Sequence, residues 1–156
     1  MKPLNSPSIG YTKIIDVEFG KGVRIIEPCN LYGCLIGEDS FIGPFVEIQS
    51  KVTIGRNCRV QSHSFICSLV TIGDDCFIGH GVNFTNDLFQ SGTPSTDQAE
   101  WLPTLVENNV SIGSGSTILP VKIVTGCVIG AGSVVTKDLS IKGTYAGNPA
   151  KLIRKI

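Results

Sequence analysis

Charged residues are scarce in this sequence, and neither sign is in excess. Of its 156 residues, 13 are lysine or arginine and 13 are aspartate or glutamate, so the formal net charge is zero. A general nucleic-acid-binding protein shows a basic excess, so this balance argues against nucleic acid as a partner. No run approaches the ~18 apolar residues of a membrane span, and the start has no apolar signal-peptide core. We expect a cytoplasmic protein without a membrane span.

Metal-binding and disulfide motifs are also missing. The six cysteines form no CxxC pair, and the chain contains only two histidines, His63 and His80. The absence of a CxxC pair argues against a zinc ribbon. Without a secretory signal, a disulfide framework is not expected either. We therefore expect no metal site, and we interpret the cysteines as small, buried hydrophobic residues.

Branched aliphatic residues and glycine are plentiful, and they recur with a period of six. Steps of six from Ile36 meet only branched aliphatic or aromatic residues, namely Ile36, Ile42, Ile48, Ile54, Val60, Ile66, Ile72, Ile78 and Phe84. Four places after each of the first eight stands a small or β-branched residue, such as Ser40 or Cys58. Glycine often follows the aliphatic directly, as at Gly37 and Gly55. The repeat is therefore aliphatic-Gly-x-x-small-x.

A period of six does not fit an α-helix, but it suits a short strand followed by a turn. Three such units make a triangular coil, so that residues eighteen apart stack, and successive coils pair as parallel strands about 4.8 Å apart. The aliphatic side chain fills the interior, and the small residue sits where two walls converge. Glycine is expected to provide unusual backbone angles at the corners. The sequence predicts an all-β protein, a parallel β-helix of about six coils.

The repeat also predicts how the chain is organised. We expect one domain over residues 1–156, with a lead-in at 1–18, coils at 19–85 and 105–140, and a C-terminal segment at 141–156. The repeat stops after Phe84, so residues 86–104 are predicted to leave the coil as an extruded loop. Two steps are shortened to five residues, from Leu31 to Ile36 and from Ile118 to Ile123.

This repeat resembles that of the hexapeptide-repeat acyltransferases, over residues 19–156. Three stretches are similar to nucleotide-sugar N-acetyltransferases that act on 3-amino-3,6-dideoxyhexoses and related amino sugars: VQSHSFICSLVTIGDDCFIGHGVNFTND, WLPTLVENNVSIGSGSTILPVKI, and IGAGSVVTKDL with GTYAGNPAKLIRKI. The resemblance implies a left-handed winding, an exception to the usual right-handed crossover. It also implies a homotrimer with active sites between its prisms.

The same resemblance implies a reaction. Acetyl-CoA would be the donor, and the acceptor would be the amino group of a nucleotide-linked amino-dideoxy sugar used for lipopolysaccharide and other cell-surface polysaccharides. Such a transfer needs a neutral amine, donors for the developing oxyanion and both substrates held in line.

The two histidines are candidates for accepting the amine proton. Because coils repeat after eighteen residues, His63 and His80 are predicted at one corner of adjacent coils, facing outward. Histidine titrates near neutral pH and can act as a general base. We take His80 as the catalytic candidate and His63 as a substrate-binding one. The alternative for each is a turn histidine that bonds to the backbone.

Asn86 and Asp87 stand where the loop departs from the coil. By resemblance they contact the amino sugar: Asn86 would hold the amine or the thioester carbonyl, and Asp87 would accept from the ammonium or serve as base. The identity of the base stays open, and an Asx-turn that starts the loop is the alternative for both residues. Trp101 either covers the substrate cleft or anchors the loop.

By resemblance, the pantetheine arm of the cofactor runs along the later coils. It would meet backbone groups around Ser114, Ala131 and Gly132. The CoA phosphates would lie near Lys137, Lys151 and Arg154, because the C-terminal segment has a local basic excess. The alternative is a solvated basic tail.

Three other functions share this predicted fold. A γ-type carbonic anhydrase needs three zinc-binding histidines, which two histidines cannot supply. An O-acetyltransferase that acts on a sugar or serine hydroxyl would depend more strongly on a base. A non-catalytic assembly protein would not bind CoA.

Overall fold

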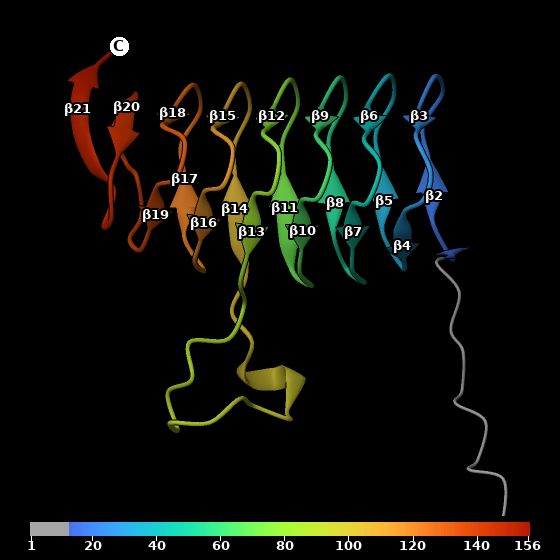
Figure 1. Cartoon of the computed structure of the whole chain (residues 1–156), viewed down its shortest axis with the longest axis horizontal. Coiled ribbons are helices and arrows are strands. Elements are labelled where there is room, and N and C mark those ends of the chain that lie inside the picture. Colours follow the sequence, from blue (N-terminus) through green and yellow to red (C-terminus); the bar gives the residue numbers. More distant parts are fainter. Residues whose placement is uncertain (1–12) are drawn as a thin grey trace, which may run out of the picture.

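The chain folds into a triangular prism with three parallel-sheet walls (Figure 1). A computed structural model describes residues 13–156. The first wall contains β1 (Ile14–Ile15), β4 (Asn30–Tyr32), β7 (Glu47–Ile48), β10 (Phe65–Ile66), β13 (Asn83–Phe84), β16 (Thr117–Ile118) and β19 (Val134–Val135). The second contains β2 (Glu18–Phe19), β5 (Leu35–Ile36), β8 (Thr53–Ile54), β11 (Val70–Ile72), β14 (Thr104–Val106) and β17 (Lys122–Ile123). The third contains β3 (Arg24–Ile25), β6 (Phe41–Ile42), β9 (Arg59–Val60), β12 (Phe77–Ile78), β15 (Ser111–Ile112), β18 (Val128–Ile129), β20 (Gly143–Ala146) and β21 (Lys151–Lys155).

The register follows the predicted eighteen-residue coil where the repeat is regular. Phe65 pairs with Glu47 on one side and with Asn83 on the other, eighteen residues away in each direction. A coil that contains a five-residue step pairs at a spacing of seventeen, as between Leu105 and Lys122. This is the predicted all-β, left-handed parallel β-helix.

The interior is built as the repeat predicts. The aliphatic positions from Ile36 to Phe84 are almost completely buried, and so are the small positions between them. Buried polar groups at the small positions bond to the next coil: Ser40 Oγ donates to the Gly55 carbonyl at 2.9 Å, and Cys58 Sγ to the Gly73 carbonyl at 3.0 Å. All six cysteines are free and buried, as predicted.

The glycines that follow the aliphatic residues have a different role from the one predicted. Gly37, Gly55 and Gly79 do not adopt positive φ angles; the positive φ falls two residues later, for example at Asp39 and Asn57. A Cβ added at Gly37 would lie 2.5 Å from the carbonyl carbon of Gly55 in the next coil. Glycine is therefore needed here because the coils approach closely, and the left-handed residue of each turn is a different one.

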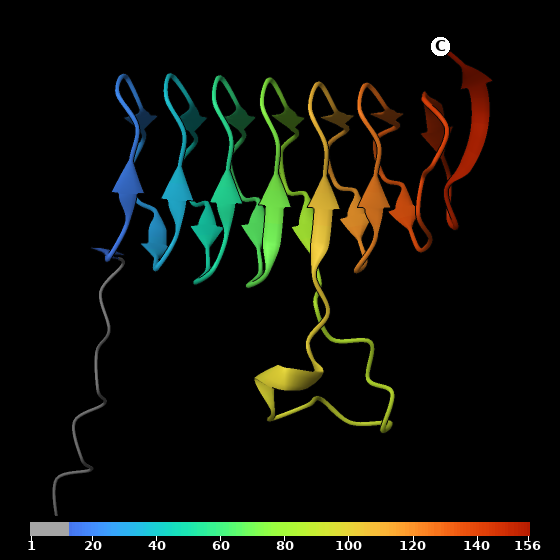
Figure 2. The same cartoon turned by 180° about the vertical axis from the view of Figure 1, so that it is seen from behind.

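The extruded loop and both shortened steps lie at the corner between the first and second walls. The loop joins β13 to β14 and hangs away from the prism (Figures 1 and 2), and it contains a short 3₁₀ turn at Gln98–Glu100. Because the coil between Val70 and Thr104 includes this loop, these two cross-strand partners are 34 residues apart in the sequence. This corner therefore tolerates changes in length that the other two corners do not show.

The coils extend further at both ends than the sequence predicts. β1 pairs with β4 and β2 with β5, so the prism already includes Ile14–Ile15 and Glu18, inside the predicted lead-in of residues 1–18. The first wall has seven strands, which corrects the predicted six coils to about seven. Residues 1–12 of the lead-in lie outside the described residues. At the other end β20 continues the third wall, and β21 turns back antiparallel to it.

Candidate active site

His63 and His80 lie at the corner between the third and first walls, on adjacent coils, as predicted. We call this edge the histidine corner; its successive coils contribute Phe45, Ser62–His63, His80–Gly81, Ser114–Gly115 and Ala131–Gly132. Backbone bonds connect its coils, from Gly81 N to Ser62 O at 3.0 Å and from Gly115 N to His80 O at 2.8 Å. The predicted cofactor residues Ser114, Ala131 and Gly132 therefore continue the same edge that carries His80.

A serine on the preceding coil orients the imidazole of His80. Ser62 Oγ lies 2.8 Å from His80 Nδ1, and the ring is exposed to solvent. If Nδ1 carries the hydrogen and donates it to Ser62, then Nε2, across the ring, is available to accept a proton. The backbone N–H of His80 donates to Ser114 Oγ at 3.1 Å. His63 differs, because its ring stacks on Phe45 with centroids 4.8 Å apart.

Beyond His80, the histidine corner becomes a row of glycines with free space above them. Gly81, Gly115 and Gly132 adopt φ angles of 63°, 69° and 68°. A Cβ added at any of them would meet no atom within 4 Å. The left-handed turn favours glycine, and its lack of a side chain leaves an unobstructed path beside the imidazole.

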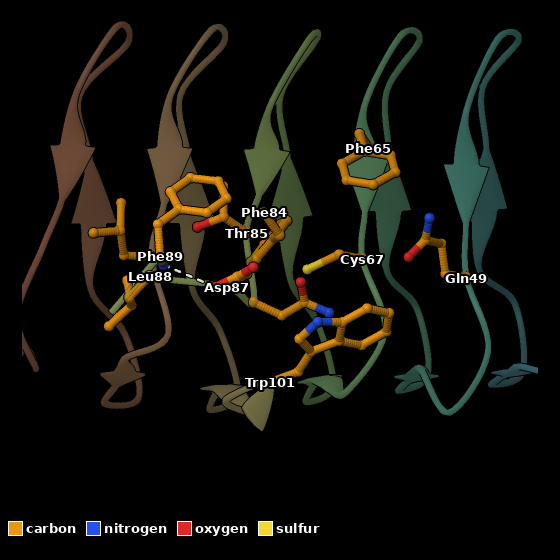
Figure 3. Close-up of a pocket in the computed structure, with 11 residues that line it drawn as sticks. Gln49, Phe65, Cys67, Phe84, Thr85, Asp87, Leu88, Phe89 and Trp101 are labelled. Atoms are coloured by element: carbon orange, nitrogen blue, oxygen red, sulfur yellow. Dashed lines mark hydrogen bonds between the residues drawn. The ribbon is translucent and has the colours of Figure 1, made fainter. Parts of the chain in front are cut away.

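A second feature lies on the first wall, under the extruded loop. A cavity of about 580 Å³, which we call the loop pocket, is lined by Gln49, Phe65, Cys67, Phe84, Thr85, Asn86, Asp87, Leu88, Phe89, Trp101 and Leu119. Trp101 lies on the side of Cys67, and Leu88 and Phe89 lie on the other side of Asp87 (Figure 3). Three predicted substrate residues, Asn86, Asp87 and Trp101, are thus brought together in one largely apolar pocket.

Asn86 and Asp87 also hold the loop in place. Asn86 Nδ2 donates to the Ser68 carbonyl at 3.2 Å, on the previous coil. The Asp87 carboxylate accepts from Phe89 N at 2.8 Å and from Ser95 N at 2.7 Å. The first of these Asp87 contacts is the Asx-turn considered as an alternative. Asn86 Oδ1 has no hydrogen bond to residues 13–156, so it could face a ligand.

The structure separates two groups that the prediction placed in one site. His80 precedes β13 at the histidine corner, whereas Asn86 and Asp87 follow β13 at the opposite edge of the first wall. A single chain therefore does not bring the His80 imidazole and the side chains of Asn86 and Asp87 to the same substrate atom.

The predicted phosphate ligands are likewise dispersed. Lys151 pairs with Ala146, whose Cβ lies beside Gly130, the residue before Ala131 of the histidine corner. Arg154 pairs with Thr144 at the far end of β20, and Lys137 follows β19 towards the second wall. Only Lys151 is placed next to the glycine row.

Sequence reasoning missed several residues around these features. Ser62 and Phe45 could have been found by stepping back eighteen residues from His80 and His63. Cys67, in the loop pocket, gave no signal beyond its burial, which raises the pKa of its thiol to about 12. This thiol therefore stays protonated at neutral pH and contributes an apolar surface.

The prism and its six-residue period define a hexapeptide-repeat protein. A family model described as bacterial transferase hexapeptide (six repeats) matches residues 33–68. A second, the hexapeptide repeat of succinyl-transferase, matches residues 69–82 and 103–137. Together the two models match residues 33–82 and 103–137, so the chain is a hexapeptide-repeat protein similar to these transferases.

Individual relatives match only in part or at low identity. The bifunctional protein GlmU of Thermotoga petrophila is 33% identical over 141 residues, covering 90% of this chain but 28% of its own length. A mutant of AntD, an N-acyltransferase from Bacillus cereus, was solved in complex with dTDP and coenzyme A; it has a TM-score of 0.74 at 22% identity, covering 85% of this chain and 82% of its own. A hexapeptide-repeat acetyltransferase from Vibrio cholerae O1 biovar eltor was solved in complex with acetyl coenzyme A. It has a TM-score of 0.68 at 24% identity, and the match covers 79% of this chain and 70% of its own. Both of these solved structures share the fold of this chain.

Two features are absent from residues 13–156. These residues contain no group of three or more His, Cys, Asp or Glu side chains placed to hold a metal ion. The same residues form no helix with the length and apolar character of a membrane span.

Proposed function

We propose that the protein transfers an acetyl group from acetyl-CoA to the amino group of a nucleotide-linked amino-dideoxy sugar. The observation that carries this proposal is the open glycine row beside His80, which offers a thioester arm a path along the edge of the prism. Two structural relatives support it, one solved with acetyl coenzyme A and one, an N-acyltransferase, with dTDP and coenzyme A.

In this proposal the donor lies along Gly81, Gly115 and Gly132, with Lys151 nearest to its charged end. The amine nitrogen attacks the thioester carbonyl carbon, the carbon–sulfur bond breaks, and His80 Nε2 accepts the amine proton. The proton then passes to the departing thiolate. Ser62 keeps the ring oriented, since its hydroxyl bonds to Nδ1.

The acceptor site is proposed in the loop pocket, with Asn86 Oδ1 towards the amine and Trp101 covering the sugar. Since His80 and Asn86 lie on opposite edges of the first wall, a complete site requires two copies of the chain. A homotrimer with the histidine corner of one copy facing the loop of the next would supply it.

The test is thiol release from acetyl-CoA with a panel of nucleotide-linked amino sugars and matching hydroxyl sugars. We expect turnover with the amines, a loss of about 100-fold or more in His80→Ala, and a loss of tenfold or more in Asn86→Ala. Gly115→Asn, which fills the proposed donor path with a residue that tolerates positive φ, should raise the KM for acetyl-CoA about tenfold. Gly126→Asn is the control, at a left-handed turn of another corner, where only the flexible Lys142 side chain has to move.

The outcomes separate the alternatives. Thiol release with hydroxyl acceptors alone would make the protein an O-acetyltransferase. Calorimetry that detects no binding of acetyl-CoA or CoA would make it a non-catalytic assembly protein.

A further inference from the structure

Phe45 is an aromatic residue in an unfavourable conformation and an exposed position. Its side chain is 57% exposed, and its backbone φ is 59°, in the left-handed region that disfavours bulky residues. The equivalent turn residue at another corner is Asn57 or Asn109, a type that suits this conformation. One face of the Phe45 ring is covered by His63, with an interplanar angle of 29°. Core packing does not account for this aromatic pair, since both Phe45 and His63 are exposed.

A hollow lies next to Phe45, on the first wall. It has a volume of about 230 Å³ and is lined by Pro28, Cys29, Asn30, Phe45, Val46 and Glu47. Asn30 and Glu47 are cross-strand partners and provide an amide and a carboxylate. The hollow therefore combines an aromatic face with polar groups that can bond to the edge of a flat ring and to hydroxyl groups.

This hollow adjoins the loop pocket. Gln49, which lines the loop pocket, donates from Nε2 to Glu47 Oε1 at 3.1 Å. Phe65, another residue of that pocket, is the direct cross-strand partner of Glu47. A ligand that fills the loop pocket could therefore extend into the hollow within one strand spacing, on the side away from the glycine row.

We propose that the hollow beside Phe45 binds the nucleoside part of the nucleotide-linked acceptor. The base stacks on Phe45, the Asn30 amide bonds to its edge, and the Glu47 carboxylate accepts from the ribose hydroxyls. This inference rests on the proposed function, and it assigns opposite directions to the two substrates. The acceptor nucleotide lies over the N-terminal coils of the copy that supplies the loop pocket, and the donor lies over the C-terminal coils of the neighbouring copy. The two substrates meet near that neighbour's His80.

The test measures nucleotide binding separately from transfer. UDP, dTDP and CoA are titrated by calorimetry into the full chain and into Phe45→Asn, Phe45→Trp and Phe77→Ala. Phe45→Asn removes the ring but suits the left-handed turn, Phe45→Trp keeps a stacking face, and Phe77 is a part-exposed phenylalanine on the third wall. We expect the Kd of UDP or dTDP to rise at least about tenfold in Phe45→Asn alone, because a stacked base is lost. The Kd of CoA should not change.

Kinetics give a second readout. In Phe45→Asn the KM for the nucleotide-linked sugar should rise by a similar factor, while kcat and the KM for acetyl-CoA stay within about twofold. Unchanged nucleotide affinity in Phe45→Asn would overturn the proposal. So would weaker binding of CoA, which would assign the ring to the donor, or a change in assembly mass, which would assign it to a subunit contact. Failure of UDP and dTDP to bind the unaltered chain would overturn it too.

The two proposals fail in different ways. If Phe45-dependent nucleotide binding is found but no amino sugar is acetylated, the nucleoside site stands and the proposed reaction is wrong. If Phe45→Asn acetylates amino sugars with the same KM for the nucleotide-linked sugar as the unaltered chain, the proposed reaction stands and the nucleoside site is wrong.

Discussion

At the scale of single residues, two kinds of glycine position serve different purposes in this prism. Gly37, Gly55 and Gly79 have ordinary backbone angles but lie against the backbone of the next coil. Gly81, Gly115 and Gly132 have left-handed angles and open space above them. The first kind is needed for stability, and the second kind leaves room for a ligand.

Gly55→Ala should therefore destabilise the protein more than Gly115→Ala. The added Cβ at Gly55 would lie 2.5 Å from the Gly73 carbonyl carbon, so the coils must move apart. We expect a loss of about 3 kcal/mol in the free energy of unfolding, as for severe overpacking. Gly115→Ala should cost about 1–2 kcal/mol, the penalty of a left-handed alanine. Urea denaturation of the two variants measures the difference, and equal losses would contradict this account.

At the scale of elements, the extruded loop is held mainly by polar contacts at its base. Asp87 accepts from two backbone N–H groups eight residues or fewer away, and Asn86 connects the loop to the previous coil. The Leu102 N–H donates to the Asn86 carbonyl at 2.8 Å, which closes the loop. The same residues line the loop pocket, so loop order and substrate binding are coupled through them.

Asp87→Asn should loosen the loop without unfolding the coils. The amide keeps one acceptor oxygen, so one of the bonds to Phe89 N and Ser95 N is lost. We expect hydrogen exchange at these two amides to accelerate about fivefold to tenfold, as for the loss of a hydrogen bond worth about 1 kcal/mol. Exchange in β12 should stay unchanged. A fall in turnover with no change in loop exchange would instead give Asp87 a chemical role.

Glu107 connects two coils on the second wall through its charge. Its carboxylate contacts Lys122 Nζ at 2.9 Å and accepts from Thr125 N at 2.9 Å. The Lys122 contact, followed by those to Thr125, lowers the pKa of Glu107 to about 2. Because the folded-state pKa is depressed, the stabilisation is present above the ordinary glutamate pKa and is lost as the pH falls towards 2.

Glu107→Gln should therefore be less stable than the parent chain at pH 7, and the difference should shrink between about pH 4.5 and pH 2. Urea denaturation at several pH values measures both. Glu38→Gln is a control on the same edge, because Glu38 is exposed and takes part in no ion pair within residues 13–156. A difference between the parent chain and Glu107→Gln that does not vary with pH would contradict the assignment.

At the scale of the whole molecule, the period of six was sufficient to predict the fold. Every residue from Ile36 to Phe84 in the stepped series is buried where the prism requires it. Ile14 and Ile15 escaped detection because they lie in the first described coil and are exposed, so they lack the interior pattern. The histidine corner was predictable because its residues repeat by coil. The loop pocket was not, because the loop has no repeat and its contacts depend on how residues 86–104 fold back.

Assembly into an oligomer is also a property of the whole molecule. We expect a homotrimer, with a mass by light scattering three times the 16.6 kDa of the chain. If His80 and Asn86 of different copies share each site, mixing His80→Ala with Asn86→Ala and reassembling them should restore turnover. Random mixing leaves about a quarter of the sites with both residues intact in a symmetric ring. No recovery in a mixed trimer would place both residues of a site on one chain.

The reversal of β21 has a consequence for how the third wall can be extended. A stack of parallel rungs ends in unpaired N–H and C=O groups, onto which another chain can add indefinitely. Here the last rung of the third wall is covered by a strand running the opposite way, with an irregular register between Thr144 and Tyr145 and with Lys151, Arg154 and Lys155 along it. β21 therefore places an antiparallel, charged strand where another prism would otherwise continue the parallel ladder of the third wall.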